Sequence, residues 1–380
     1  MIVTIIADVL GDENNGTTTA CMNLVRYLKK QGDEVRIVCS DIDKRNLEGY
    51  YIVDKINFGP LNKIVERNNV SLAKIDKDIL EEAIKGSDIV HIMLPFLLSI
   101  AAINIANSLN IPVTAGFHCQ AENVTSHLGL MDNRLANKAT YKLFYKLLYK
   151  KVQAIHYPTE FIRNIFENIN KCKTNGYVIS NGVHSRFISK NIKKPKELND
   201  KFLILFTGRF SKEKSHKILI KAASKSKYKD KIQLIFAGQG PLHDRLIYES
   251  KKYKINIPIM KFFSKDELVD VINYCDLYCH PAEVEIEAIA CLEAISCGLV
   301  PIIANSKKCA TKSFALDEMN LFKCNDYNDL AKKIDYWIIN ENERIKRKEE
   351  YLNYSKIFNQ DLCMEKMRNM LKEISDKYHA

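Results

Sequence analysis

The sequence lacks a hydrophobic run long enough to cross a membrane as a helix. Its longest apolar window, residues 89–106, is interrupted by His91, Pro95 and Ser99, whereas a membrane-spanning helix needs about 20 consecutive apolar residues. The opening residues, Met-Ile-Val-Thr-Ile-Ile-Ala-Asp, have neither the basic start nor the cleavage site of a signal peptide. We therefore expect a cytoplasmic protein.

The 11 cysteines contain no C-x-x-C pair. An odd number without metal-ligand spacing argues against a disulfide framework or a metal centre and favours a reducing compartment. Cys275 and Cys279 with His280 have the residue types of metal ligands, but the alternation along 276–280 predicts a strand. We interpret these residues as core and expect no bound metal.

Length and charge bound the remaining possibilities. A chain of 380 residues is too long for one ordinary core, and 46% apolar residues suffice for two. The net charge of +11 favours a polyanionic partner. Because no nucleic-acid-binding motif is present, we expect no nucleic acid, and an anionic membrane surface is the other candidate.

Short apolar runs alternate with amphipathic helical patterns along the whole chain, which predicts a parallel-sheet α/β fold in each half. The lysine-rich segment 189–200 separates the two series and has the composition of a linker. The predicted strands cover 2–7, 34–39, 89–93, 113–117, 154–157 and 178–180 in the first half, and 202–206, 233–237, 257–260, 277–280 and 300–304 in the second.

Two glutamates, Glu285 and Glu293, flank the predicted start of a helix within residues 280–298. A strand, a loop, a helix start and a second strand form a βαβ unit, whose loop end is where ligands bind in open α/β sheets. Unpaired N–H groups at the helix start favour a phosphate. Glu293 lies in the apolar stretch 289–295, where a charge without a partner is costly. The pattern indicates a nucleotide-sugar site rather than two solvated glutamates.

Two cations, Arg209 and Lys214, follow the strand at 202–206 directly. Gly208 lets the backbone approach a ligand closely. A diphosphate leaving group needs its developing charge neutralised, and two cations can do this without a metal. A helix start is an unfavourable place for cations, so an anion between them explains the pair better than solvation does. Asp41-Ile-Asp43, a D-x-D pattern, has no phosphate context.

The segment 280–298 resembles the E-x7-E signature of retaining glycosyltransferases with the GT-B fold, in the family 4 group. Residues 207–214 are similar to the G-R-x-x-x-E-K element of that family, and residues 236–242 to its G-x-G-P element. The resemblance implies two Rossmann-like domains facing a cleft. We expect an acceptor-side domain at 1–190, a nucleotide-sugar-binding domain at 191–355, and a C-terminal helix at 356–380 that packs on the first domain.

The resemblance also implies roles for individual residues. Arg209 and Lys214 hold the donor diphosphate, Glu285 orients sugar hydroxyls, and His118 supports the sugar from the other domain. Gly16 approaches the donor, although a simple loop with a Thr cap explains the same residues equally well. The expected donor-binding positions are Gly16, Gly208, Gly238, Phe262, Leu292 and Glu293. The chain departs from the family at 286–288, where Ile-Glu-Ala replaces Gly-Phe-Gly, which puts sugar preference and geometry in doubt.

Polar residues also gather after the strand at 113–117, and a basic stripe follows them. The motif Phe-His-x-Gln-Ala-Glu-Asn at 117–123 resembles the corresponding segment of bacterial enzymes that glycosylate diacylglycerol, so we expect a lipid acceptor. Residues 134–151 carry a basic residue at every fourth position and no acidic residue, which suits a helix on an anionic bilayer with its aromatics at the headgroups. A domain helix with a solvated basic edge is an equal alternative. The polar residues are His118, Gln120, Glu122, Asn123 and His127, and the stripe is Arg134, Lys138, Lys142, Lys146 and Lys150.

These patterns predict a metal-independent transferase that moves a hexose, with glucose preferred, from a nucleotide diphosphate sugar to a hydroxyl with retention of configuration. No cofactor is expected, and UDP-glucose is the preferred donor. The lipid acceptor implies peripheral contact with the inner face of the cell membrane. Three alternatives stay open: a non-catalytic partner subunit, a transferase for a polysaccharide or small-molecule acceptor, and an epimerase or hydrolase on the same architecture.

Overall fold

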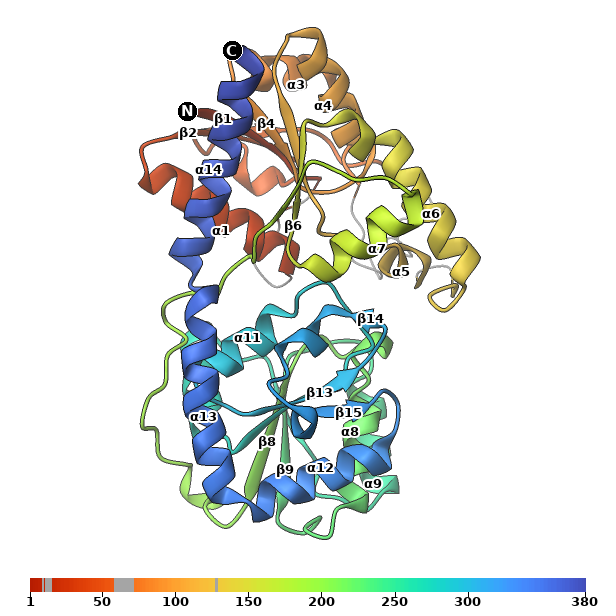
Figure 1. Ribbon diagram of the computed structural model, residues 1–380, viewed down its shortest axis with the longest axis vertical. Helices are drawn as coiled ribbons and strands as arrows, with labels where there is room; N and C mark the ends of the chain where they lie inside the picture. The colour runs from red at the N-terminus through yellow and green to blue at the C-terminus, as the bar shows by residue number, and fades with distance from the viewer. Residues whose placement is uncertain (9, 11–15, 58–71, 127–128) are drawn as a thin grey trace. The chain divides into compact units, whose positions relative to one another are not determined.

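The computed structural model describes residues 1–8, 10, 16–57, 72–126 and 129–380. These residues form two compact units (Figure 1). Unit 1 comprises Met1–Asn181 and Asp361–Ala380, and unit 2 comprises Gly182–Gln360. Each unit contains a wholly parallel main sheet with helices packed on it, which confirms the predicted α/β class.

Unit 1 is built on a seven-stranded sheet of order β3-β2-β1-β4-β5-β6-β7. The chain proceeds outward from β1 on one side and then returns to β4 on the other, so the strand order reverses between these two strands. Ligands of such sheets bind at the carboxyl ends of the strands, at the reversal. The strands are β1 (Ile2–Ile6), β2 (Glu34–Cys39), β3 (Tyr50–Ile52), β4 (Ile89–Ile92), β5 (Val113–Gly116), β6 (Ala154–Tyr157) and β7 (Gly176–Val178). The helices are α1 (Gly16–Lys30), α3 (Lys77–Ile84), α4 (Leu97–Ser108), α5 (Ala121–Ser126), α6 (Arg134–Leu147), α7 (Glu160–Asn170) and α14 (Gln360–His379).

The C-terminal helix α14 packs on unit 1, where it lies alongside α1 (Figure 1). Its buried methionines Met364 and Met367 join the same core cluster as Leu24 of α1. Arg368 donates two hydrogen bonds to Asp33, with Nε–Oδ2 and Nη2–Oδ1 distances of 2.6 and 3.0 Å. An apolar stripe and a bidentate ion pair therefore hold the end of the chain on the first unit.

Unit 2 is built on a six-stranded sheet of order β10-β9-β8-β11-β13-β15, with its reversal between β8 and β11. A separate pair of short strands, β12 and β14, forms a small parallel sheet. The strands are β8 (Phe202–Thr207), β9 (Ile232–Ala237), β10 (Ile259–Lys261), β11 (Leu277–His280), β12 (Val284–Glu285), β13 (Pro301–Asn305), β14 (Lys308–Cys309) and β15 (Leu321–Lys323). The helices are α8 (His216–Lys225), α9 (His243–Lys252), α10 (Lys265–Tyr274), α11 (Ile289–Ser296), α12 (Tyr327–Ile339) and α13 (Glu341–Ser355).

The predicted strands agree with the structure except at edges. Strand β10 begins at Ile259 rather than at Ile257, because Pro258 cannot donate a ladder hydrogen bond. Strand β7 covers Gly176–Val178, so it shares only Val178 with the predicted strand at 178–180. The C-terminal helix predicted at 356–380 begins at Gln360 as α14, since a 3₁₀ turn (Lys356–Phe358) separates it from α13, which ends at Ser355.

Two expectations from composition concern the cysteines and the membrane. All 11 cysteines are free, and most are buried, as their apolar surroundings predict. Within the described ranges, the structure contains no helix with the length and apolarity to span a bilayer.

Candidate functional site

Three loops meet at the carboxyl edge of the unit 2 sheet, at its reversal point. The loop after β11 is tied to the loop after β8, because the Glu283 amide donates to the Glu213 carbonyl at 2.8 Å and the Ser215 hydroxyl donates to the Glu283 carboxylate at 3.1 Å. It is also tied to the chain after β13, where the Ser306 hydroxyl donates to the Glu283 carbonyl at 2.7 Å. This bonding brings the two predicted motifs, 207–214 and 280–298, into one site.

The glycines after β9 allow two backbones to touch. A Cβ at Gly238 would lie 2.1 Å from the Gly208 carbonyl oxygen, and a Cβ at Gly240 would lie 2.7 Å from the Phe210 amide nitrogen. The Phe210 amide donates to the Gln239 carbonyl at 3.0 Å. Gly238, predicted to bind the donor, therefore has a packing role in shaping the loop that carries Arg209.

Lys214 and Glu285 form an ion pair at this edge. Lys214 Nζ donates a hydrogen bond to Glu285 Oε1, and the two side chains are 21% and 15% exposed. Burial would raise the pKa of Glu285, but Lys214 and His280 outweigh it and hold that pKa at about 2. Burial lowers the pKa of Lys214, but Glu285 reverses this and raises it overall. Both groups are therefore charged at neutral pH.

A buried histidine supports the same carboxylate. His280 Nε2 lies 3.4 Å from Glu285 Oε1, and His280 Nδ1 lies 3.2 Å from the Tyr278 hydroxyl. Burial keeps the pKa of His280 low, so the ring is neutral. The Tyr278 hydroxyl can donate to Nδ1, and Nε2 faces the carboxylate without a hydrogen bond among the described residues. The prediction that His280 belongs to the core is confirmed by its burial, and its ring also lies against the Glu285 carboxylate.

Arg209 lies on the same loop as Lys214 and is exposed. Among the residues that the structure describes, no hydrogen bond or ion pair of the Arg209 guanidinium is found. A guanidinium presents five donors in a planar fork that matches phosphate oxygens. The loop after β8 thus offers one paired cation and one available cation.

Glu293 lies in α11, away from the ion pair. Its side chain is half-buried, and desolvation raises its pKa to about 8, although Lys265 and Arg186 oppose this. Glu293 is therefore largely protonated at neutral pH and can donate a hydrogen bond. Neighbouring Leu292 is wholly buried in the unit 2 core, so its side chain packs and only its backbone can meet a ligand.

The chain enters α11 through Ala288, which has φ 61° and ψ 64°. This left-handed conformation costs a residue with a Cβ about 1 kcal/mol, whereas glycine adopts it freely. The departure from the family pattern at 286–288 therefore places an alanine where a glycine fits best. Phe262, on the loop before α10, is 56% exposed, and Gly208 has room for a Cβ with no contact under 3.4 Å.

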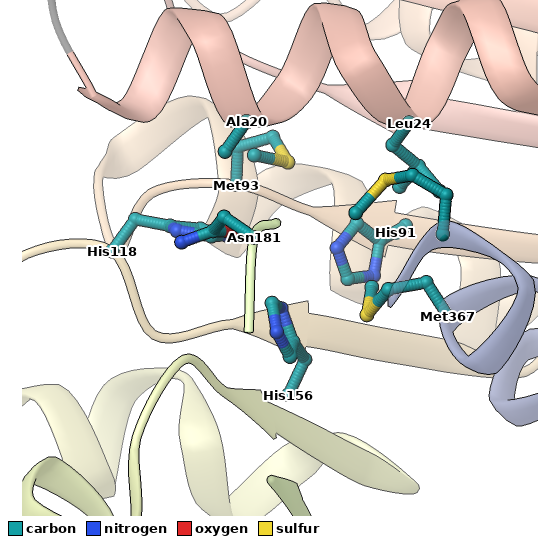
Figure 2. Close-up of a pocket in the computed structure, with 9 residues that line it drawn as sticks. Ala20, Leu24, His91, Met93, His118, His156, Asn181 and Met367 are labelled. Atoms are coloured by element: carbon teal, nitrogen blue, oxygen red, sulfur yellow. The ribbon is translucent and has the colours of Figure 1, made fainter. Parts of the chain in front are cut away.

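Unit 1 contains a cavity ringed by three histidines (Figure 2). His91, His118 and His156 line it together with Asn181, Met93 and two methionines of α14, Met364 and Met367. Its volume of about 10 Å³ holds about one water molecule. The His118 ring sits so close to Gly116 that a Cβ there would lie 2.4 Å from Nε2. His118 is thus positioned by a glycine and by the His156 ring, whose centroid is 5.4 Å away.

Burial keeps this cluster neutral. Desolvation lowers the pKa of His91 to about 3 and that of His156 to about 4, and it lowers the pKa of His118 as well. His156 Nε2 donates to the Ile179 carbonyl at 2.7 Å, which leaves Nδ1 as an acceptor without a partner among the described residues. The cluster offers uncharged hydrogen-bonding groups.

The other polar residues predicted to converge with His118 do not all do so. Glu122 is buried and accepts a hydrogen bond from the Tyr141 hydroxyl at 2.8 Å, so it fixes α6 instead. Gln120 is buried and Asn123 is exposed. His127 lies outside the described residues. Gly16 is exposed at the first residue of α1, and the loop before it is also outside them.

Helix α6 corrects part of the membrane prediction. Its aromatics Tyr141 and Phe144 are buried, as is Tyr149, and the Tyr141 and Tyr149 rings pack on Phe117 and Phe166. These rings cannot lie at lipid headgroups, because the inner face of the helix needs them for its core. The exposed face carries the basic stripe together with three leucines. The leucines are Leu135, Leu143 and Leu147, exposed by 80%, 52% and 38%.

Sequence reasoning missed four residues of these sites: His91, His156, Tyr278 and His280. His91, His156 and His280 share a signal, a histidine inside an otherwise apolar parallel strand. A polar ring in such a strand is unusual enough to mark a site. Only folding shows that His91 and His156 face the same cavity.

Comparisons with known proteins cover nearly the whole chain. Residues 14–187 match the family Glycosyltransferase Family 4, and residues 187–354 match Glycosyl transferases group 1. The alpha-monoglucosyldiacylglycerol synthase of Streptococcus pneumoniae is 24% identical over 319 residues, which cover 80% of this chain and 71% of that protein. The catalytic domain of the Helicobacter pylori cholesterol-alpha-glucosyltransferase is 45% identical, covers 40% of this chain and 96% of that chain, and has a TM-score of 0.40. Anabaena HepE, solved with UDP and glucose, is 13% identical, covers 98% of this chain and 100% of that chain, and has a TM-score of 0.75, which shows a shared fold.

Proposed function

Because the chain belongs to the GT-B glycosyltransferases that join a family 4 domain to a group 1 domain, we propose that it transfers a hexose from a nucleotide diphosphate sugar to a hydroxyl of a membrane glycerolipid. The observation that carries the proposal is the loop after β8, which presents Arg209 and Lys214 at the reversal of the unit 2 sheet. Glucose is the hexose and UDP the carrier that we favour. The relatives named above include a glucosyldiacylglycerol synthase and a protein solved with UDP and glucose.

In this proposal the leaving diphosphate is held by Arg209 and Lys214, and their charge stabilises it as the glycosidic bond breaks. Glu285 accepts hydrogen bonds from sugar hydroxyls, and Glu293, as a protonated acid, binds the ribose. His118 supports the sugar as a neutral ring. The departing phosphate deprotonates the acceptor on the same face of the sugar, so the configuration is retained. The two cations replace a metal ion in this scheme.

The experiment is turnover of labelled nucleotide sugars with and without diacylglycerol vesicles, in EDTA. Transfer from UDP-glucose to lipid, with an α-linked product and no loss in EDTA, is expected. Release of free sugar without acceptor would indicate a hydrolase. Turnover only with a non-lipid hydroxyl compound would show that the acceptor is not a lipid. Absence of turnover with every donor and acceptor, in folded protein, contradicts an enzymatic role.

We also propose that the exposed face of α6 rests on an anionic membrane. Lys138, Lys142 and Lys146 are all exposed, and Leu143 and Leu147 are exposed beside them. Cationic side chains bind anionic headgroups while leucines enter the interface. Such contact would keep the protein near its lipid acceptor.

Vesicle sedimentation tests this contact. Binding to phosphatidylglycerol vesicles is expected to weaken with salt and to fall about 30-fold or more in Lys142→Glu/Lys146→Glu, since each lysine near the surface contributes about 1 kcal/mol. The matched control is Lys366→Glu/Lys372→Glu, which makes the same charge change at exposed positions of α14. Equal losses in both double variants would show that only net charge matters.

A further inference from the structure

The Lys214–Glu285 pair sets a problem for the proposed function. Lys214 is assigned to the donor diphosphate, yet its ammonium already donates to the Glu285 carboxylate. The carboxylate and an incoming diphosphate carry the same sign, and both would lie within a few ångströms of Lys214. In a partly buried site such like charges repel strongly.

The surroundings of Glu285 show what can move. Its backbone is fixed, because β12 pairs with β14 and Glu285 is in register with Cys309. Its side chain has a second partner, His280 Nε2 at 3.4 Å, which is neutral and belongs to a buried strand. A rotation about the side-chain bonds can therefore take the carboxylate off Lys214 while the backbone and the histidine stay in place.

We propose that Glu285 is an internal competitor of the donor diphosphate: it occupies Lys214 in the structure, and diphosphate binding displaces it to face the sugar hydroxyls. The proposal rests on the proposed function and deepens it. One side chain thereby links the two halves of the donor, since Glu285 becomes available to the sugar only when phosphate takes its place on Lys214.

The ion pair also explains how two opposite charges remain stable at the sheet edge. The pKa of Glu285, at about 2, keeps the carboxylate ionised at every pH at which the protein is used. The carboxylate that occupies Lys214 is therefore ionised at neutral pH.

The test is calorimetric titration of UDP, GDP and ADP into the wild-type protein and into Glu285→Gln. Glutamine keeps the size and the hydrogen-bonding oxygen but not the charge. We expect the nucleotide that binds the wild type to bind Glu285→Gln about tenfold more tightly, because the competing charge is gone. Sugar transfer by the same variant is expected to fall, with a lower KM and a lower kcat.

The matched control is Glu249→Gln. Glu249 makes a similar pair, with Lys217 Nζ 2.6 Å from its Oε1, and its side chain is 5% exposed, but neither residue belongs to the loops of the site. Unchanged nucleotide affinity is expected. An equal gain in Glu249→Gln would reduce the effect to net charge and overturn the proposal.

The failures of the two proposals differ. If the wild type binds none of the three nucleotides, the proposed function falls and this inference falls with it. If the wild type binds one and folded Glu285→Gln binds it equally or more weakly, only the inference is overturned. A crystal structure of the wild type with that nucleotide serves where the variant does not fold: Lys214 on a phosphate oxygen with the carboxylate turned away is expected, and a carboxylate still on Lys214 contradicts the proposal.

Discussion

The carboxyl edges of the two sheets have the same topology and opposite chemistry. Both sheets reverse their strand order beside their first strand, between β1 and β4 in unit 1 and between β8 and β11 in unit 2. In unit 2 the reversal carries Arg209 and the Lys214–Glu285 ion pair. In unit 1 the nearby strand ends carry His91, His118 and Asn181 around a small cavity. The same scaffold thus presents charge in one unit and neutral hydrogen-bonding groups in the other.

Burial explains both outcomes. Desolvation disfavours the charged form of any group, so it lowers the pKa of a histidine and raises that of a carboxyl. His91, His156 and Glu293 follow this rule. Glu285 departs from it because Lys214 and His280 lie against its carboxylate. In the proposed function, the charged edge of unit 2 binds the diphosphate and the neutral histidines of unit 1 face the sugar.

Alanine substitution at one residue from each edge should separate donor binding from sugar handling. Lys214→Ala removes a cation from the proposed diphosphate site and leaves Glu285 without its partner. We expect turnover and nucleoside diphosphate affinity to fall about 100-fold or more. His118→Ala is expected to lower kcat by about 10- to 100-fold and to leave nucleotide affinity unchanged. Titration calorimetry and initial rates measure both.

The comparison breaks if the two variants lose nucleotide affinity equally, because diphosphate would then depend on both edges. Thermal unfolding is the control for each protein, since Lys214→Ala leaves a partly buried carboxylate unpaired and is expected to lower stability.

Close glycine contacts give a second contrast. A Cβ at Gly238 would meet the backbone oxygen of Gly208, and a Cβ at Gly116 would meet the His118 ring. Backbone cannot yield without moving the loop, so Gly238→Ala is expected to destabilise unit 2 by about 3 kcal/mol and to abolish nucleotide binding. Gly116→Ala should turn the His118 ring aside and lower the stability of unit 1 by only about 1 kcal/mol.

Urea unfolding followed by tyrosine fluorescence measures the two stabilities. Equal losses of stability would mean that the His118 ring is held as rigidly as the backbone of the unit 2 loop.

The sequence placed the residues of the charged edge on the loops where the structure has them, but it did not reveal the histidine cluster of the neutral edge, for a physical reason. Arg209, Lys214 and Glu285 stand in continuous motifs on loops, where each charge needs an explanation that a local pattern can supply. The histidine cluster is assembled from β4, β6 and the loop after β5, so no local pattern contains it. The sequence also did not show that Lys214 and Glu285 pair with each other, because that depends on how the two loops are tied.

The prediction that the aromatics of α6 lie at lipid headgroups was wrong for a related reason. Lysines at every fourth position mark the outer face of a helix correctly, but aromatics on both sides of the stripe do not say which side is core. Phe117 and Phe166 settle this by packing against the Tyr141 side of the helix. Tertiary packing decided the question, and helical periodicity could not.

Opposite pH trends should appear in the two units. Glu293 has a pKa of about 8 in the fold against 4.5 in an unfolded chain, so its contribution to stability is complete below 4.5 and is lost as pH rises through 8. His156, at about 4 against 6.5, contributes fully above 6.5 and loses its contribution as pH falls through 4. We expect the free energy of unfolding of Glu293→Gln to exceed that of the wild type by about 1–2 kcal/mol at pH 8.5 and to equal it at pH 4.

His156→Gln should show the reverse, with its advantage over the wild type appearing only as pH falls below 6.5. Amide hydrogen exchange in β8 and β11 reports unit 2, and exchange in β4 and β5 reports unit 1. Parallel pH dependence of the two variant-minus-wild-type differences would contradict the assignment of the two groups.

The smallest expected effect concerns Ala288, at the start of α11 in unit 2. Ala288 has φ 61°, so Ala288→Gly relieves left-handed strain and should stabilise unit 2 by about 0.5–1 kcal/mol, after the greater entropy of an unfolded glycine is subtracted. The control is Ala290→Gly, two residues into the same helix, where glycine is expected to cost about 1 kcal/mol. Urea unfolding distinguishes the two signs. A loss of stability in both variants would mean that the Ala288 methyl makes contacts worth more than its strain, and the departure at 286–288 would then be a packed feature of the donor site.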